Sequence, residues 1–346
     1  MNNRMMAAVL YGKEHLQVEP VAVPTIQGGD ILVRVKAALT CGTDVKVFRR
    51  GYHARMIVPP AVFGHELAGD VVAVGEGVTG FSVGQRVVAA NSAPCEQCYF
   101  CRRGLQNLCE DLLFNNGAYA EYIRIPARIV ERNTYAIPAH VGYQDAALVE
   151  PLACVVRGFE ETNPLPGDTI AIIGLGPIGL MFVKLAKLRG CRVIAVGRRK
   201  TQLERAGLLG ADELITGTDE ASPVDTIRQL THGLGVDIAI EAVGQPLTWE
   251  WAVAMVRRGG TVNFFGGCPN HSTVELDTAL LHYSEITCKA SFHHTPAYIR
   301  KALDLIYQGH ISASFFVNRE EPLANLLEVM RHLMSHNGHL KTAILP

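Results

Sequence analysis

The stretch Ile170-Ala171-Ile172-Ile173-Gly174-Leu175-Gly176-Pro177-Ile178-Gly179 joins an apolar run to a glycine-rich turn. An apolar strand, a turn and the start of a helix follow one another here, which is the order that a dinucleotide-binding turn requires. In such a turn Gly174 permits the tight bend, Gly176 lets a pyrophosphate approach the backbone, and Gly179 lets the helix pack closely on the strand. We therefore predict that Gly174, Gly176, Pro177, Ile178 and Gly179 bind a dinucleotide.

Strands and helices alternate along the chain after this turn. Helical stretches such as 177–189 and 200–209 separate short apolar segments that are typical of buried strands. This α/β alternation predicts a parallel, doubly wound sheet. The expected strands are 169–173, 192–196, 213–215, 237–241, 261–265 and 285–290.

The segments before and after this α/β region have a different sequence pattern. Residues before 150 form mostly short strand candidates separated by Gly and Pro, with strands expected at 31–37, 67–74 and 86–90. After residue 291 we expect a helix at 296–307, a short strand near 315–317, a helix at 323–334 and a last strand at 341–345. We expect this tail to rejoin the first segment. The predicted domains are therefore 1–155 with 292–346, and 156–291.

Composition excludes several classes of protein. The 346 residues include 32 Lys+Arg and 33 Asp+Glu, so the formal net charge is -1 and gives no electrostatic argument for a nucleic-acid or membrane partner. No apolar run approaches the roughly 20 residues that cross a bilayer. The N-terminal apolar stretch before Tyr11 is too short for a signal peptide. We expect a cytoplasmic protein that acts on a small molecule.

Four of the nine cysteines lie close together in the sequence, as Cys95, Cys98, Cys101 and Cys109. Two-residue spacers and a further thiolate a few residues on let one loop surround a tetrahedral ion, and four thiolates form a closed structural zinc set. The alternative is a group of reduced surface cysteines or redox pairs, which the cost of exposed reactive thiols disfavours. We predict a structural zinc ion that holds the loop and takes no part in catalysis.

A second candidate set is dispersed along the chain. Cys41 and Thr43 lie in an expected loop, His65 and Glu66 at the start of an expected strand, and Glu150 just before the domain change. One thiolate, one imidazole and one or two carboxylates can form an open zinc site that leaves a position for water or substrate. Each residue alone is a weak signal, so these residues by themselves leave the site undecided.

Together these motifs resemble those of the zinc-dependent medium-chain dehydrogenases, and most of all the sorbitol (L-iditol) and threonine dehydrogenase branch. The resemblance is carried, in order and over nearly the whole chain, by Gly64-His65-Glu66-Leu67-Ala68-Gly69 with Gly75 and Val78, the four cysteines, Glu150-Pro151 and the turn 174–179. It implies a GroES-like β-rich catalytic domain joined to a Rossmann domain, with the active site in the cleft between them. It also implies a homodimer or homotetramer.

The same resemblance implies roles for individual residues. Cys41, His65 and Glu66 match the ligands of a catalytic zinc, and Glu150 matches a carboxylate that ligates the metal or holds its water. Thr43 matches the hydroxyl that passes the proton of the alcohol outward. The zinc acts as a Lewis acid, so that a secondary alcohol of a polyol, sugar or related compound gives its hydride to a nicotinamide cofactor and becomes a ketone.

Some residues depart from the family pattern. Lys46 stands where the relatives usually have a histidine that ends the proton relay. Val47 stands where sorbitol dehydrogenases carry a pocket tyrosine, and His293-His294 stand near the positions of their substrate-facing Arg-Tyr pair. We regard Lys46, Val47, His293 and His294 as candidate substrate residues. Oxidation of an amino alcohol, as in threonine dehydrogenase, stays an alternative, as does a dinucleotide-binding protein without turnover.

The residues after the strand 192–196 bear on the choice of cofactor. Sites that bind NAD place an acid here to accept hydrogen bonds from the ribose, whereas this chain has Gly197-Arg198-Arg199-Lys200. The glycine leaves room for a bulky group, and cations at a helix start are unfavourable unless an anion lies among them. The alternative is that these side chains point into solvent. We predict that Arg198 and Arg199 bind the 2′-phosphate of NADP(H), in preference to NAD(H).

Overall fold

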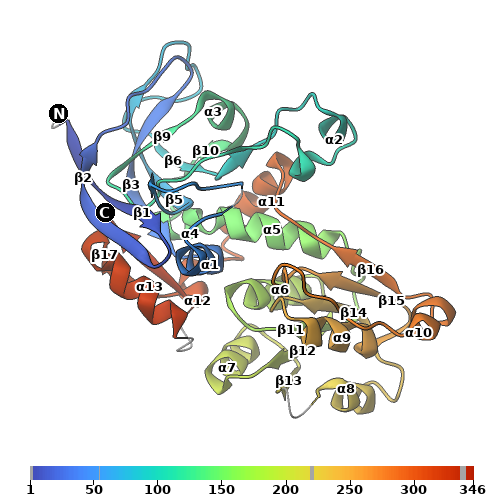
Figure 1. The fold of residues 1–346 in the computed structure, drawn as a ribbon. Helices are drawn as coiled ribbons and strands as arrows, with labels where there is room; N and C mark the ends of the chain where they lie inside the picture. Colours follow the sequence, from blue (N-terminus) through green and yellow to red (C-terminus); the bar gives the residue numbers. More distant parts are fainter. Residues whose placement is uncertain (1–2, 54, 219–221, 336–339) are drawn as a thin grey trace. The chain divides into compact units, whose positions relative to one another are not determined.

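The computed structural model describes residues 3–53, 55–218, 222–335 and 340–346 (Figure 1). The chain divides into two compact units. Unit 1 comprises Met1–Ala153 and His294–Pro346, and unit 2 comprises Cys154–His293. Helix α5 (Val149–Glu160) begins in unit 1 and ends in unit 2.

Unit 2 is built on a six-stranded sheet in the order β13-β12-β11-β14-β15-β16, and every pairing in it is parallel. This confirms the predicted doubly wound sheet. Its strands are β11 (Thr169–Ile173), β12 (Arg192–Gly197), β13 (Glu213–Thr216), β14 (Val236–Glu241), β15 (Val256–Phe264) and β16 (Thr287–Ala290). Its helices are α6 (Pro177–Leu188), α7 (Lys200–Leu208), α8 (Val224–Leu230), α9 (Pro246–Met255) and α10 (Thr278–Tyr283).

The central strands of unit 2 are buried along almost their whole length. In β11 and β12 only the first residue is partly exposed, and all the others are buried. This is expected where helices cover both faces of a parallel sheet. The chain crosses from one side of β11 to the other between β12 and β14. The carboxyl ends of β11 and β14 therefore mark the switch point at which such sheets bind ligands.

Unit 1 is β-rich, as predicted. Its main sheet has seven strands in the order β10-β6-β5-β3-β18-β17, with β9 also paired to β3, beside a sheet β2-β1-β4 and the pair β7-β8. The strands are β1 (Arg4–Gly12), β2 (His15–Ala22), β3 (Ile31–Leu39), β4 (Ala61–Val62), β5 (Glu66–Val74), β6 (Arg86–Ala89), β7 (Ser92–Ala93), β8 (Leu113–Phe114), β9 (Tyr122–Ile125), β10 (Thr134–Ala136), β17 (Val317–Pro322) and β18 (Lys341–Leu345). The helices are α1 (Gly42–Arg50), α2 (Tyr99–Arg102), η1 (Gln106–Leu108), α3 (Ala127–Asn133), α4 (Tyr143–Ala147), α11 (Pro296–Tyr307), α12 (Ala313–Phe316), η2 (Leu323–Asn325) and α13 (Leu326–Met334).

Segments from the two ends of the chain meet in this sheet. Strand β18 pairs antiparallel with β3 through Ala343 opposite Leu39, so the last strand of the chain lies beside one of the first. Phe48, Phe63 and Ile344 pack in one hydrophobic cluster around these strands. The tail after residue 293 is thus an integral part of unit 1.

The segment expected as a loop at Cys41 is instead the start of a helix. Cys41 caps α1, where its Sγ accepts a hydrogen bond from the Thr43 N–H at 3.4 Å. The Asp44 carboxylate accepts the Cys41 N–H at 3.1 Å in return. This reciprocal capping satisfies N–H groups that the first helical turn leaves unpaired, and it explains why the expectation was wrong.

Several further boundaries differ from those expected; β15, for example, begins at Val256 and not at 261. The strand near 315–317 begins only at Val317, because Ser312 caps the short helix α12 with its hydroxyl. The helix expected at 323–334 opens as the 3-10 turn η2 and becomes α-helical at Leu326. Propensity alone does not separate such short caps and turns from the elements beside them.

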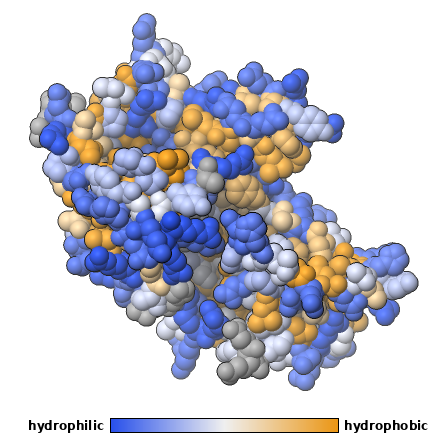
Figure 2. Space-filling view, viewed as in Figure 1, coloured by the Kyte–Doolittle hydropathy of each residue, from blue (hydrophilic) through white to orange (hydrophobic). Residues whose placement is uncertain are grey.

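The surface mixes hydrophilic and apolar side chains on the face shown in Figure 2. Tyr99, Leu105 and Leu108, which lie among the four clustered cysteines, are exposed to 57%, 41% and 40%. Among the described residues, no helix combines the length and the apolar character that a membrane span needs.

Candidate active site

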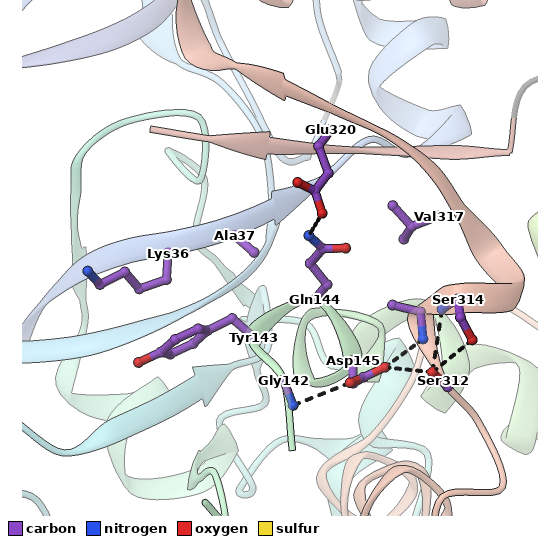
Figure 3. A pocket seen from close by; sticks show the side chains of 11 residues that line it. Lys36, Ala37, Gly142, Tyr143, Gln144, Asp145, Ser312, Ser314, Val317 and Glu320 are labelled. Atoms are coloured by element: carbon purple, nitrogen blue, oxygen red, sulfur yellow. Dashed lines mark hydrogen bonds between the residues drawn. The ribbon is translucent and has the colours of Figure 1, made fainter. Parts of the chain in front are cut away.

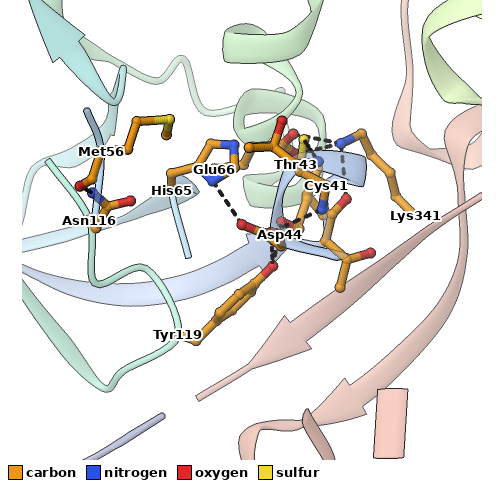
Figure 4. A network of polar contacts seen from close by, with 11 residues as sticks. Cys41, Thr43, Asp44, Met56, His65, Glu66, Asn116, Tyr119 and Lys341 are labelled. Carbon is orange, nitrogen blue, oxygen red and sulfur yellow. Dashed lines mark hydrogen bonds and ion pairs between the residues drawn. The ribbon is translucent and has the colours of Figure 1, made fainter. Parts of the chain in front are cut away.

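Three predicted ligands lie together in unit 1. One ligand atom each of Cys41, His65 and Glu66 falls within 4.8 Å of the other two (Figure 4). The register of β3 against β5 places Glu66 opposite Leu39, two residues before Cys41, which explains the approach of these distant segments. His65 and Glu66 are 4% and 0% exposed. The donors therefore meet in a largely buried place.

Asp44 holds the ring of His65. Its Oδ1 lies 3.0 Å from His65 Nδ1, and its Oδ2 accepts the hydroxyl of buried Tyr119 at 2.5 Å. Burial opposes a charged ring, but the Asp44 carboxylate raises the pKa of His65 well above its ordinary value. A histidine that offers one nitrogen to a metal commonly donates its other N–H to a carboxylate, so this contact leaves Nε2 as the donor atom.

A buried lysine holds Glu66. Lys341, in β18 and 3% exposed, places its Nζ 2.7 and 2.6 Å from the two Glu66 carboxylate oxygens and donates to the Thr40 carbonyl at 3.0 Å. Burial raises the pKa of Glu66 to about 7 although Lys341 opposes the change. Lys341 is not among the predicted site residues, and no local signal separates it from a surface lysine.

The donor set fits a zinc ion. A thiolate, an imidazole and a carboxylate are the ligands that zinc takes in open sites. Glu66 differs from the other two donors, because both of its carboxylate oxygens already contact Lys341 Nζ.

Glu150 lies outside this set of three. It is 7% exposed in α5, and its Oε1 is 3.8 Å from Nε2 of His294. The same His294 nitrogen is 3.0 Å from Asn91 Oδ1. Burial raises the pKa of Glu150. Two predicted residues, Glu150 and His294, therefore come together, with Asn91 as a partner that sequence reasoning does not identify.

Three other predicted residues, Thr43, Lys46 and Val47, share helix α1 but differ in their exposure. Thr43 is partly buried in the first turn of α1, and Lys46 on the same helix is exposed. Val47 is 4% exposed and packs in the hydrophobic core of unit 1. His293 belongs to unit 2 and has a left-handed backbone with φ of 66°.

The four-cysteine lobe brings its sulfur atoms to one point. The Sγ atoms of Cys95, Cys98, Cys101 and Cys109 lie within 4.8 Å of one another, and Cys109 Sγ also accepts the Cys95 N–H at 3.3 Å. Backbone hydrogen bonds from Cys101 and Glu110 lower the pKa of Cys98 to about 6, whereas burial raises that of Cys101 to about 12. Four thiols and no other donor match a closed zinc set.

The glycine turn of unit 2 has the backbone that the sequence predicts. Gly174 has φ of 94°, a conformation that side chains disfavour, and a Cβ on it would lie 2.5 Å from Val243 Cγ2. A Cβ on Gly179 would lie 1.8 Å from the Gly174 carbonyl oxygen. Helix α6 begins at Pro177 with Gly176 as its cap, so its free N–H groups lie at this turn.

Gly197, the last residue of β12, requires one correction. A Cβ on Gly197 would lie 2.8 Å from Leu175 Cδ1, so this glycine accommodates Leu175 and does not leave room for a ligand group. Arg198 is exposed. Arg199 is partly buried and donates from Nε to Gln202 Oε1 at 3.0 Å. Both arginines directly precede α7, and Arg199 is its N-cap residue.

A separate hollow of about 540 Å³ opens on unit 1 (Figure 3). Its polar side chains contact one another, as in the 2.6 Å bond from Gln144 to Glu320 and the 3.1 Å bond from Ser312 to Asp145. Within the described part of the chain, none of the residues that line it is a predicted site residue.

Comparison with known proteins decides the family. A model of the alcohol dehydrogenase GroES-like domain matches residues 27–135, and a model of zinc-binding dehydrogenases matches residues 177–308. Sorbitol dehydrogenase of Bacillus subtilis (strain 168) is 32% identical over 350 residues, which cover 99% of this chain and 97% of that protein. The chain belongs to the zinc-dependent alcohol dehydrogenase family.

Other members of this alcohol dehydrogenase family are similar as well. L-threonine 3-dehydrogenase of Symbiobacterium thermophilum is 35% identical over 76% of this chain and 74% of its own. A zinc-binding dehydrogenase of Sinorhizobium meliloti 1021 bound to NADP superposes with a TM-score of 0.90 at 29% identity, over 99% of both chains. An alcohol dehydrogenase of Escherichia coli CFT073 complexed with NADH also gives 0.90, at 25% identity and over 100% of both chains.

These similarities confirm three expectations. The protein is an alcohol dehydrogenase of the sorbitol and threonine dehydrogenase branch, with a GroES-like domain and a Rossmann domain. It is an oxidoreductase that transfers a hydride between an alcohol and a nicotinamide cofactor.

Proposed function

We propose that this enzyme oxidises a secondary alcohol of a polyol or sugar-like compound, with Cys41, His65 and Glu66 as ligands of a catalytic zinc. The approach of these three donors to within 4.8 Å carries the proposal. Similarity to a sorbitol dehydrogenase over 99% of the chain supports the polyol class. When bound, the zinc would supply a Lewis acid that lowers the pKa of the substrate hydroxyl.

The surrounding residues orient this site. Asp44 fixes the tautomer and rotation of His65 through Nδ1, which directs Nε2 toward the donor cluster. Lys341 neutralises Glu66 in its buried position. Glu150, held near His294, would bind the metal or its water.

A substrate screen tests this proposal. Polyols, sugars, hydroxy acids and L-threonine would each be assayed with both nicotinamide cofactors, and the zinc content of the same preparation would be measured. We expect the highest kcat/KM with a secondary polyol. Turnover of L-threonine without turnover of polyols would favour the alternative that the threonine dehydrogenase relative suggests. Cofactor binding without any turnover would favour a non-catalytic dinucleotide-binding protein.

A proton must leave the substrate hydroxyl, and we propose Thr43 as its first acceptor. The Thr43 hydroxyl is partly buried two residues after the ligand Cys41, whereas Lys46 is exposed and, when protonated, has no lone pair with which to accept. Thr43→Val is expected to lower kcat by roughly 100-fold or more, and Lys46→Ala by much less. Steady-state kinetics of both variants at one pH would check this order, and equal losses would contradict it.

We further propose that Cys95, Cys98, Cys101 and Cys109 bind a second zinc with a structural role. Their four sulfur atoms supply every position of a tetrahedral ion, so no position is left for a substrate. The protein would then contain two zinc ions per chain.

We propose that the enzyme prefers NADP(H), with Arg198 and Arg199 on the 2′-phosphate. Exposed and partly buried guanidinium groups at the start of α7 can form forked hydrogen bonds to a phosphate, and no acid follows β12. Replacing both arginines with alanine is expected to raise the KM for NADP by at least about tenfold and to change the KM for NAD little. Kinetics with both cofactors measure this.

Two results would contradict the cofactor proposal. One is a clear preference of the unaltered enzyme for NAD. The other is an unchanged KM for NADP in the double variant. Lys200→Ala serves as the matched control, because Lys200 is 90% exposed and its nearest carboxylate, Glu204, is 3.9 Å away.

We also propose that the Rossmann domains of two copies meet edge to edge in a homodimer or homotetramer. Strand β16 is the last strand of its sheet, and its residues are mostly exposed, as is typical of an edge that another strand can extend. The molar mass from light scattering would test this, and a monomer at micromolar concentration would contradict it.

A further inference from the structure

Glu241 occupies the switch point of the sheet in unit 2. It is the last residue of β14 and pairs with Ile173, the last residue of β11, which the glycine turn follows directly. Ligands bind doubly wound sheets at this place. The residue is 0% exposed, so its carboxyl group lies wholly inside the protein.

One carboxyl oxygen of Glu241 accepts three hydrogen bonds from the segment that follows it. Its Oε1 lies 2.8 Å from the Val243 nitrogen, 2.8 Å from the Gly244 nitrogen and 2.7 Å from the Thr248 hydroxyl. Its backbone carbonyl accepts the N–H groups of Phe265 at 3.0 Å and Gly266 at 2.9 Å. Glu241 therefore connects the loops that follow β14 and β15.

These two loops are packed against each other and against the glycine turn. A Cβ on Gly244 would lie 2.4 Å from the Gly267 carbonyl oxygen. A Cβ on Gly174 would lie 2.5 Å from Val243 Cγ2. A shift of the Val243-Gly244 backbone would therefore be transmitted directly to the first glycine of the turn.

Burying the carboxyl group of Glu241 in this position costs free energy. Among the described residues, Oε2 of Glu241 has no partner in hydrogen-bond geometry, although the Trp249 side chain acts to lower the pKa of the carboxyl group. Burial raises its pKa, against the effect of Thr248 and the two backbone N–H groups. An apolar side chain would avoid this cost. We therefore attribute the carboxyl oxygen to the hydrogen bonds that it accepts from the loop.

We propose that Glu241 is a positioning residue for the nicotinamide cofactor, because it fixes the Val243-Gly244 segment against the Gly174 turn. The proposal rests on the cofactor site proposed for unit 2. The new element is that a buried residue outside the glycine motif contributes to cofactor affinity.

Equilibrium binding tests the proposal. NADPH and NADH would be titrated by fluorescence into the full-length protein and into Glu241→Ala, Glu241→Gln and Thr248→Val. Removing the shared acceptor is expected to raise the Kd by at least about tenfold, and losing one of three hydrogen bonds by about threefold. Glu241→Gln keeps an oxygen for the three donors and is expected to stay within about threefold of the unaltered protein.

Asp237 supplies a matched control for mere destabilisation. It lies at the other end of the same strand, where its carboxylate accepts the Thr169 N–H at 2.7 Å and the Arg257 Nε–H at 2.6 Å. Asp237→Ala is expected to lower the melting temperature without changing the cofactor Kd. If Glu241→Ala and Asp237→Ala changed the Kd equally, or if Glu241→Ala bound as the unaltered protein does, the proposal would be wrong.

Two other outcomes are distinguishable. If Glu241→Ala does not fold, Thr248→Val and Glu241→Gln decide the question, and an unchanged Kd in Thr248→Val would contradict the proposal. If the unaltered protein binds neither NADPH nor NADH, the proposed function fails at its first step, before Glu241 is tested.

Discussion

A Cys41→Ala variant is expected to lose turnover by at least about 1000-fold while it keeps its fold and about half of its zinc. The thiolate of Cys41 is one of three donors at the open site, and a methyl group cannot replace it. Cys41 also caps α1 through its Sγ, so a small decrease in melting temperature is expected as well. Metal analysis, circular dichroism and kinetics on one preparation measure all three properties.

Cys98→Ala is the matched control, because it removes one thiolate from the other cluster. That variant should lose stability and one zinc ion, and its kcat per folded molecule should change little. Full activity in Cys41→Ala would refute the assignment of the open site. Loss of activity in Cys98→Ala at unchanged melting temperature and zinc content would refute the structural role of the lobe.

In protein stripped of metal with a chelator, Lys341→Met is expected to lower the free energy of unfolding by about 3–5 kcal/mol, because it leaves the Glu66 carboxylate buried without a cation. The methionine fills a similar volume, so the loss reports charge more than packing. Chemical denaturation monitored by circular dichroism measures the change.

The double variant Glu66→Gln/Lys341→Met separates this effect from a packing defect. A neutral amide beside an apolar side chain no longer leaves a buried charge unpaired, so most of the lost stability should return. Lys46→Met, which removes an exposed lysine from the same unit, should change stability little. A double variant as unstable as Lys341→Met would contradict the charge explanation.

The sequence is most informative where one motif fixes several elements. The glycine turn sets the end of β11 and the start of α6, and the structure has β11 at Thr169–Ile173 and α6 from Pro177, where both were expected. The four clustered cysteines could be predicted as one site for a similar reason, because the short spacers between them allow few arrangements of their sulfur atoms.

Residues that act through distant contacts could not be predicted in this way. Lys341 meets Glu66 across 275 positions of sequence, and the contact depends on β18 pairing with β3. Glu241 resembles any acid at a strand end until the loops around it are seen. Gly197 was misinterpreted for the same reason, since the Leu175 side chain that needs its space lies on another element.

The discontinuity of unit 1 has a consequence for synthesis on the ribosome. Strand β3 pairs with β5 on one side and with β9 and β18 on the other, and the whole of unit 2 is translated before β18. Unit 2 is a continuous segment, so it is able to fold first, at a stage when the Ala38-Leu39 end of β3 still lacks its partner β18. Lys341 lies in β18 and is therefore translated only after unit 2. Until then the Glu66 carboxylate has no ammonium partner, so water has to solvate it, and its burial becomes favourable only when β18 completes the sheet.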